Sequence, residues 1–292
     1  MTSPVVPFIG YRSWEHDPVR GEARVLSVCD MDFSGTKIYK FNRLGFRGEE
    51  FDPDAAKRIF FCGCSYTFGT GLNIEETASH KFKLRYCDSL GLAYQAVNAL
   101  NFAMPGASND YIVRTLLAQC RLTRPDVVVA IFSHVNRAEH IDEQALGERV
   151  WTAAPWWVRE VTSELRAPNA AAEQRTELMR EASLGYIQYT TPANAASNFL
   201  RNALLLQFYC ETNSIPYVFH WVEFDNFSYL ENHFALGDTV QLLNRSHFAD
   251  YANSKGYWCD RAADGAHPGP ESNSNIANAL FDVYRRLYQR QA

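Results

Sequence analysis

A serine in a glycine-rich turn is the residue of this sequence best suited to chemistry. Ser65 lies in the segment 63–71, which directly follows the short apolar run 58–62. A strand that ends in a tight glycine turn and passes into a helix presents a small hydroxyl at the carboxyl edge of a sheet, where a ligand can reach it. This placement predicts that Ser65 is a reactive hydroxyl.

A histidine and an aspartate near the end of the chain are candidate partners for this hydroxyl. A serine is a weak nucleophile until a base takes its proton, and the base needs a third group to hold its tautomer. His267 is the candidate base, and Asp264 stands three residues before it. That spacing lets one loop direct the carboxylate to one ring nitrogen and leave the other nitrogen for Ser65. Pro268 follows and suits the start of a helix.

Donors for a developing oxyanion also follow predicted strands. Acyl transfer needs hydrogen-bond donors placed in advance around the tetrahedral intermediate. The N–H of Ser65, the N–H of Gly106 and the side-chain amide of Asn136 each come after a separate apolar run. The sequence therefore predicts an oxyanion hole made by these three groups.

The elements that must position these residues alternate between strands and helices. Continuous or alternating apolar runs predict strands at 58–63, 94–102, 126–132 and 216–222. Helical periodicity and capping residues predict helices at about 77–90, 109–122, 193–212, 238–255 and 271–290. Repetition of strand and helix predicts right-handed crossovers, hence a three-layer α/β/α sandwich with a flavodoxin-like, mostly parallel sheet.

We expect one domain over residues 1–292, because a chain of this length with 47% apolar residues can bury one large core. The turn-rich stretch 1–57 predicts an N-terminal extension at the sheet edge, and residues 138–192 predict a helical insertion. Such insertions often shape the pocket of a doubly wound protein. Trp156 and Trp157 are therefore candidate substrate contacts, while an aromatic cluster that only fills the insertion's own core is an equal alternative.

Charge and composition restrict the class of partner. The net charge of −5 and the absence of a lysine or arginine cluster argue against nucleic-acid binding. Residues 1–7 lack the features of a secretory signal, and no run reaches the roughly 20 apolar residues of a membrane span. We therefore expect a soluble, cytoplasmic chain whose partner is a small molecule.

The cysteines point to no metal or disulfide framework. Seven cysteines are widely spaced and mostly embedded in apolar segments, which is typical of reduced, buried thiols. Cys62 and Cys64 have no second pair or histidine at ligand spacing nearby, so a zinc site is not expected. We expect no metal and no cofactor.

Taken together, the serine, glycine and asparagine that follow successive strands and the terminal Asp-x-x-His resemble the SGNH hydrolase superfamily, also called GDSL esterases and lipases. The resemblance extends from about residue 42 to the end of the chain. It implies that Ser65 is the nucleophile, His267 the base and Asp264 its orienting acid. It further implies that Gly106 and Asn136 contribute to the oxyanion hole.

The sequence departs from the pattern of that family at two blocks. Cys64 stands where the family commonly has an aspartate, which removes none of the catalytic groups. The third block, at 133–137, lacks the usual glycine and second acid. Either Asn136 or His134 could therefore complete the oxyanion hole.

The resemblance implies a serine hydrolase that acts on a carboxylic ester, such as an O-acetylated carbohydrate, through an acyl-enzyme on Ser65. Two alternatives remain open. One is an O-acyltransferase with the same triad, in which an alcohol intercepts the acyl-enzyme before water does. The other is a non-catalytic module that binds a glycan or peptide on the same scaffold.

Overall fold

A four-stranded parallel sheet forms the centre of the described structure. The computed structural model describes residues 14–17, 22–25, 39, 42, 46–142, 149–153, 184–186, 188, 190–223, 230, 237–249 and 259–289. The sheet order is β4-β3-β5-β8, with β3 at Lys57–Gly63, β4 at Val97–Asn101, β5 at Val127–Phe132 and β8 at Tyr217–Trp221. Counted along the chain, these strands lie in the order 2-1-3-4, which is the flavodoxin-like arrangement.

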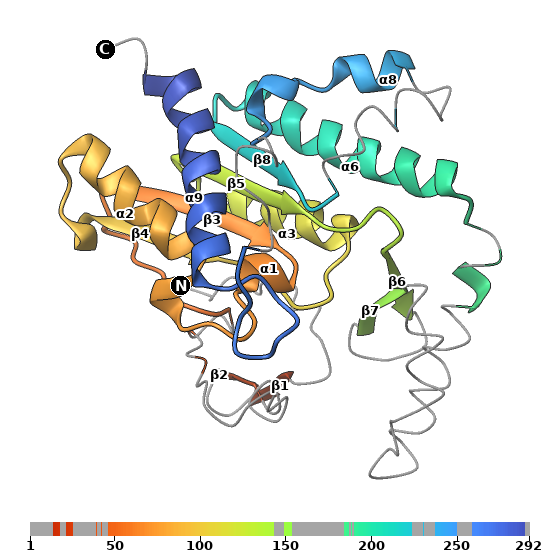
Figure 1. Ribbon diagram of the computed structural model, residues 1–292, viewed down its shortest axis with the longest axis horizontal. Helices are drawn as coiled ribbons and strands as arrows, with labels where there is room; N and C mark the ends of the chain where they lie inside the picture. Colours follow the sequence, from red (N-terminus) through yellow and green to blue (C-terminus); the bar gives the residue numbers. More distant parts are fainter. Residues whose placement is uncertain are drawn as a thin grey trace.

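Helices cover both faces of this sheet (Figure 1). One face carries α2 (Ala78–Leu90) and α9 (Pro270–Tyr284), and the other carries α3 (Asn109–Leu122) and α6 (Pro192–Thr212). Side chains of β3 alternate between the two layers: Ile59 packs with α2 and α9, whereas Phe60 packs with α3 and α6. Every residue of β5 is buried, as expected for a strand covered on both faces. The predicted three-layer α/β/α sandwich is confirmed.

Short polar signals set where the main helices begin. The side chains of Thr77, Ser108 and Thr191 each accept a hydrogen bond from a backbone N–H in the first turn of α2, α3 and α6. These caps satisfy donors that have no partner within the helix. Gly91 ends α2 in the left-handed conformation with φ 62°. These boundaries agree with the predicted ranges to within one or two residues.

Within the described residues, the predicted helix over 238–255 is confirmed only over 238–242. Helix α8 (Gly237–Leu242) ends early, and a short 3₁₀ turn follows at 245–247. The reason is a side chain from α6: Gln207 donates to the carbonyl of Leu242 and accepts from the N–H of Asn244. These bonds replace the next helical turn.

The stretch 138–192, for which the sequence predicts a helical insertion, begins with a β-hairpin in its described residues. β6 (Ala138–Asp142) pairs antiparallel with β7 (Arg149–Ala153). Val150 and Thr152 favour extended backbone, and the alanine-rich stretch lies further along the chain. Arg114 of α3 fastens the hairpin through an ion pair with Glu139 at 2.6 Å. Residues 154–183 lie outside the described residues.

The N-terminal stretch contributes a second hairpin and a segment on the sheet edge. β1 (Trp14–Asp17) pairs with β2 (Glu22–Val25). Residues 46–50, here called the edge segment, run beside β4, where Gly48 forms an antiparallel bridge with Leu100. The organisation of residues 1–292 as one domain stays a prediction.

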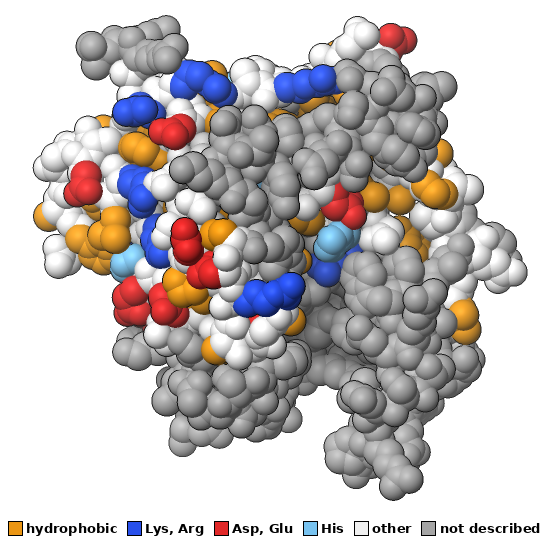
Figure 2. Space-filling model, viewed as in Figure 1, with side chains coloured by type: hydrophobic (Ala, Val, Ile, Leu, Met, Phe, Trp, Pro, Cys, Tyr) orange, Lys and Arg blue, Asp and Glu red, His pale blue; other side chains and the backbone are white. Residues whose placement is uncertain are grey.

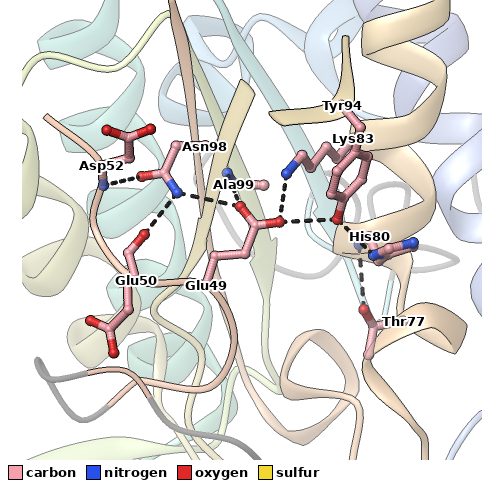
Figure 3. Close-up of polar contacts among 9 residues, drawn as sticks. All are labelled: Glu49, Glu50, Asp52, Thr77, His80, Lys83, Tyr94, Asn98 and Ala99. Carbon is pink, nitrogen blue, oxygen red and sulfur yellow. Dashed lines mark hydrogen bonds and ion pairs between the residues drawn. The ribbon is translucent and has the colours of Figure 1, made fainter. Parts of the chain in front are cut away.

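An ionic cluster around a buried lysine fastens the edge segment (Figure 3). The Glu49 carboxylate accepts hydrogen bonds from the Lys83 ammonium at 2.5 Å, the Tyr94 hydroxyl at 3.0 Å and the Ala99 N–H at 3.2 Å. The Lys83 side chain is only 2% exposed, and its nitrogen lies 3.5 Å from the centroid of the Tyr94 ring. Glu49 is thus the counter-charge of a buried cation.

Charged side chains of both signs are interspersed over the described part of the face in Figure 2. Within the described residues, no helix has both the length and the apolar character needed to cross a bilayer. In the same part of the chain, no group of histidine, cysteine and acidic side chains has the arrangement of a metal site.

Replacing Glu49 by alanine is expected to lower the free energy of unfolding by about 3 kcal/mol, because the Lys83 ammonium would stay buried without a counter-charge. Urea denaturation at neutral pH measures the loss. The exposed neighbour provides the matched control: Glu50→Ala is expected to change stability by less than about 0.5 kcal/mol. Equal effects of the two substitutions would contradict this account of the cluster.

Candidate active site

The topology of the sheet places one loop at its switch point. β3 lies between β4 and β5, and the chain order reverses there. Ligands of doubly wound proteins bind outside the carboxyl ends of the strands at such a point. Ser65 follows the end of β3 with only Cys64 between them. The fold therefore positions Ser65 where a ligand is expected.

Ser65 is the first residue of the short helix α1 (Ser65–Phe68) and is 8% exposed. Cys64, at the N-cap position, makes no side-chain cap, so the first N–H groups of α1 receive no acceptor from it. A Cβ atom on Gly63 would lie 1.9 Å from Oγ1 of Thr67 and 2.9 Å from the carbonyl oxygen of Ile131. Only glycine permits this tight passage from strand to helix.

Asp264 and His267 form a close pair. Oδ2 of Asp264 lies 2.5 Å from Nδ1 of His267, while Oδ1 accepts the N–H groups of Ala266 at 2.9 Å and His267 at 3.0 Å. Burial raises the pKa of Asp264, but these hydrogen bonds outweigh it, and the pKa lies below its ordinary value of 3.8. The ionised carboxylate therefore fixes a proton on Nδ1 and leaves Nε2 as the basic nitrogen.

The loop that carries this pair packs on the serine turn. The Ala263 N–H donates to the Gly71 carbonyl at 3.3 Å, and a Cβ atom on Gly71 would lie 3.1 Å from Cγ of Asp264. The His267 ring meets the ring of Tyr66 edge to face, with centroids 5.6 Å apart. Segments from the two ends of the chain thus meet beside Ser65.

Among the described residues, the Ser65 hydroxyl and the His267 ring make no hydrogen bond with each other. The pair lies on adjoining segments, and the hydrogen bond from nucleophile to base is often longer in the absence of substrate. His267 keeps 22% of its side chain exposed, whereas Asp264 is 1% exposed. The candidate base is thus accessible, while the carboxylate beside it is buried.

Gly106 lies in a turn that is tied to the serine turn. It has φ 79°, a conformation that favours glycine. The Met104 N–H donates to the Gly63 carbonyl at 3.1 Å, and the Asn101 amide donates to the Thr67 carbonyl at 2.8 Å. The loop after β4 is therefore held against the start of α1.

The loop after β5 is tied to the same region. Oδ1 of Asn109 accepts the Ser133 N–H at 2.7 Å, and Arg137 donates to the Ala107 carbonyl at 3.3 Å. Oδ1 of Asn136 is buried and has no hydrogen-bond partner within the described residues. The loops after β4 and β5 are therefore joined by hydrogen bonds.

His134 is engaged on the opposite side of this loop. Its Nδ1 lies 2.8 Å from Oε1 of Glu223, whose second oxygen accepts the Val135 N–H at 3.0 Å. Glu223 lies two residues after the end of β8 and orients this ring. His134 is thus engaged with Glu223, whereas Oδ1 of Asn136 has no partner within the described residues. The other predicted contacts, Trp156 and Trp157, lie outside the described residues.

Three polar residues that organise the site were missed by the sequence analysis. Asn101, Asn109 and Glu223 hold the loops after β4, β5 and β8. Their positions in the sequence could have revealed them, because each lies near the carboxyl end of a predicted strand or in the first turn of the following helix. Buried amides and carboxylates in such places need partners.

Gly71→Ala is expected to lower the free energy of unfolding by more than about 1 kcal/mol, because φ is +76° and the new methyl would meet Cβ of Ala262 at 2.9 Å. Thermal unfolding measures the change. Gly91→Ala is the matched control, since φ is +62° but no atom lies within 4 Å of the added carbon. The extra loss of unfolding free energy in Gly71→Ala, compared with Gly91→Ala, measures the packing of Gly71 against the C-terminal loop. Equal losses in the two variants would contradict that packing.

The Asp264 carboxylate is expected to make stability depend on pH. Because its pKa is lower in the folded state than the ordinary 3.8, its contribution is complete above that value and is lost as the pH falls through the folded-state pKa. The stability difference between the wild type and Asp264→Asn should therefore shrink on acidification. Urea denaturation from about pH 6 to about pH 2.5 measures it. A constant difference over this range would refute the ionised carboxylate.

Comparisons with known proteins find distant likenesses only. No family model matches the sequence, and no curated protein matches it significantly. Solved structures similar to this chain include a psychrotrophic esterase from Pseudoalteromonas sp. (10% identity, TM-score 0.42, 80% of this chain and 100% of that chain). A second is a lipase/acylhydrolase from Enterococcus faecalis (16% identity, TM-score 0.35, 81% of this chain and 100% of that chain). A third is a catalytic mutant of an acetylxylan esterase from Geobacillus stearothermophilus (11% identity, TM-score 0.37, 80% of this chain and 96% of that chain). At these identities and TM-scores, the site is assigned from this chain's own topology and contacts.

Proposed function

We propose that the protein is a serine hydrolase that cleaves a carboxylic ester through an acyl-enzyme on Ser65. The observation that supports this most is the Asp264–His267 pair, which packs on the serine turn at the switch point of the sheet. A carboxylate, an imidazole and a hydroxyl in this order are the parts of a nucleophilic triad. The resemblance of the sequence to SGNH hydrolases supports the same roles.

The proposed reaction has two steps. Oγ of Ser65 attacks the ester carbonyl carbon while Nε2 of His267 takes the hydroxyl proton, and Asp264 stabilises the resulting imidazolium. His267 then gives that proton to the departing alcohol, which leaves an acyl group on Ser65. In the second step His267 takes a proton from water, the hydroxide attacks the acyl carbon, and the proton returns to Ser65 as the carboxylic acid leaves.

The oxyanion of each tetrahedral intermediate is proposed to accept hydrogen bonds from the N–H groups of Ser65 and Gly106 and from the amide of Asn136. The uncapped start of α1 and the turn at Gly106 support the two N–H donors, and Asn136 is included for its place in the loop after β5. Loss of one such donor typically costs about 2.7–4 kcal/mol of transition-state stabilisation. We propose a small-molecule or carbohydrate O-acyl ester as substrate, with an O-acetyl group as the first to test.

Ser65→Ala is expected to lower kcat for a p-nitrophenyl acyl ester by at least about 10⁴-fold while leaving the fold intact, since no other group supplies the nucleophile. A fluorophosphonate probe should label the wild type at Ser65 and leave this variant unlabelled. Ser89→Ala, at an exposed serine in the last turn of α2, is the control and should keep full activity.

The same assay separates the alternative functions. If the wild type is neither labelled nor active, the protein is a binding module and the proposed hydrolysis is overturned. If the wild type is labelled and an added alcohol diverts the acyl group from water to a new ester, the site is an acyltransferase. Release of free acid at an unchanged rate in the presence of such alcohols supports the hydrolase.

A further inference from the structure

A buried arginine contacts the turn that follows the proposed nucleophile. Arg47 lies in the edge segment and is 2% exposed. Its Nη1 donates to the carbonyls of Phe68 at 2.7 Å and Gly69 at 2.5 Å, and its Nη2 donates to the carbonyl of Leu72 at 2.6 Å. All three acceptors belong to residues 68–72, here called the acceptor turn. The hydrogen bonds given for this guanidinium thus end on backbone oxygens of one turn.

The guanidinium is well suited to hold this turn. Burial lowers the pKa of Arg47 to about 10, so the group stays charged at neutral pH. The carbonyls of Phe68 and Gly69 lie at the carboxyl end of α1, where the helix dipole favours a cation. A planar fork with fixed donors can engage several carbonyls at once, which a single ammonium cannot do with the same geometry.

Aromatic contacts fix the guanidinium from the side. Its carbon lies 4.4 Å from the ring centroid of Tyr39 and 5.1 Å from that of Phe68. The hydroxyl of Tyr39 in turn accepts the N–H of Gly71 at 2.8 Å. Arg47 and Tyr39 therefore hold the acceptor turn by both its carbonyls and an N–H group.

The acceptor turn connects the two halves of the proposed triad. At one end, the N–H groups of Gly69 and Thr70 donate to the carbonyl of Ser65 at 2.9 and 3.0 Å. At the other end, Gly71 packs directly against Asp264. A displacement of the turn would therefore shift the nucleophile and the orienting acid relative to each other.

We propose that Arg47 is a positioning residue that sets the placement of Ser65 relative to the Asp264–His267 pair by fixing the carbonyls of the acceptor turn. It contacts neither substrate nor reacting atoms in this role. The expected effect of Arg47 on kcat rests on the proposed ester hydrolysis. Its expected effect on the placement of Ser65 and the Asp264–His267 pair rests on the contacts alone.

The chain offers a matched control in Lys83. This second buried cation holds the same edge segment, but through Glu49, which lies two residues after Arg47. The Lys83 ammonium bonds to Glu49 and lies over Tyr94, and none of its described contacts is with the acceptor turn. Lys83→Met therefore loosens the edge segment without removing a donor from the turn.

Steady-state kinetics on a p-nitrophenyl acyl ester test the proposal, at a temperature where circular dichroism shows each variant folded. Arg47→Met should lower kcat by about 100-fold, the size expected of a misplacement of about 1 Å, while KM changes by less than about three-fold. Arg47→Lys should recover part of kcat, and Lys83→Met should keep kcat within about two-fold. Full kcat in Arg47→Met, or an equal loss in Lys83→Met, would overturn the proposal.

A second measurement does not depend on activity. The proton between Nδ1 of His267 and Asp264 should give a low-field ¹H NMR resonance, assigned by its absence in His267→Gln. Lys83→Met should keep this resonance and Arg47→Met should shift or lose it; an unchanged resonance in Arg47→Met counts against the proposal. Should the wild type hydrolyse no ester, the proposed function fails, and this resonance alone decides on Arg47. Should Arg47→Met not fold, Arg47→Lys takes its place in both measurements.

Discussion

The approach of Asp264 to Gly71 is the contact on which the organisation of the site depends. The loop that carries Asp264 and the turn that carries Gly71 are far apart in the sequence. They approach closely in the fold because Gly71 has no side chain between them. Covering helices α2 and α9 pack on the same face of the sheet and bring the two segments to the same end. The packing of α2 and α9 in one layer thus brings the parts of the candidate site together.

Polar side chains, more than apolar ones, give this end of the sheet its shape. The Asn101 amide donates to the Thr67 carbonyl of α1, and Asn109 joins the loops after β4 and β5. The Asp264 carboxylate accepts two backbone N–H groups and contacts the ring of His267. Each of these side chains satisfies backbone groups that would otherwise be buried without partners. The loops therefore have little freedom to rearrange, which is the condition for donors that are placed in advance of a reaction.

The parts of the structure that sequence predicts well are those set by short-range patterns. The continuous apolar run 127–132 forms a buried strand, and α3 covers the predicted range 109–122 with Ser108 as its cap. The helix predicted from residue 238 ends at Leu242 because Gln207, which is remote in the chain, forms hydrogen bonds with the backbone of Leu242 and Asn244. The predicted pair of Asp264 and His267 was readable because both residues lie on one loop, and the structure places them in contact. The contacts of Arg47 could not be predicted because its partners are carbonyl oxygens, which every residue has, and only the folded chain shows which of them it meets.

Both outer strands of the central sheet are partly occupied by single backbone bridges. Gly48 pairs with Leu100 of β4 at one edge, and Phe248 pairs with Phe219 of β8 at the other, where the Ala249 N–H also donates to the Phe219 carbonyl at 2.7 Å. An outer strand with open hydrogen-bonding groups is a template for pairing with another molecule. The ionic cluster around Glu49 keeps the edge segment beside β4, and this segment occupies part of the edge at which a further strand could otherwise add.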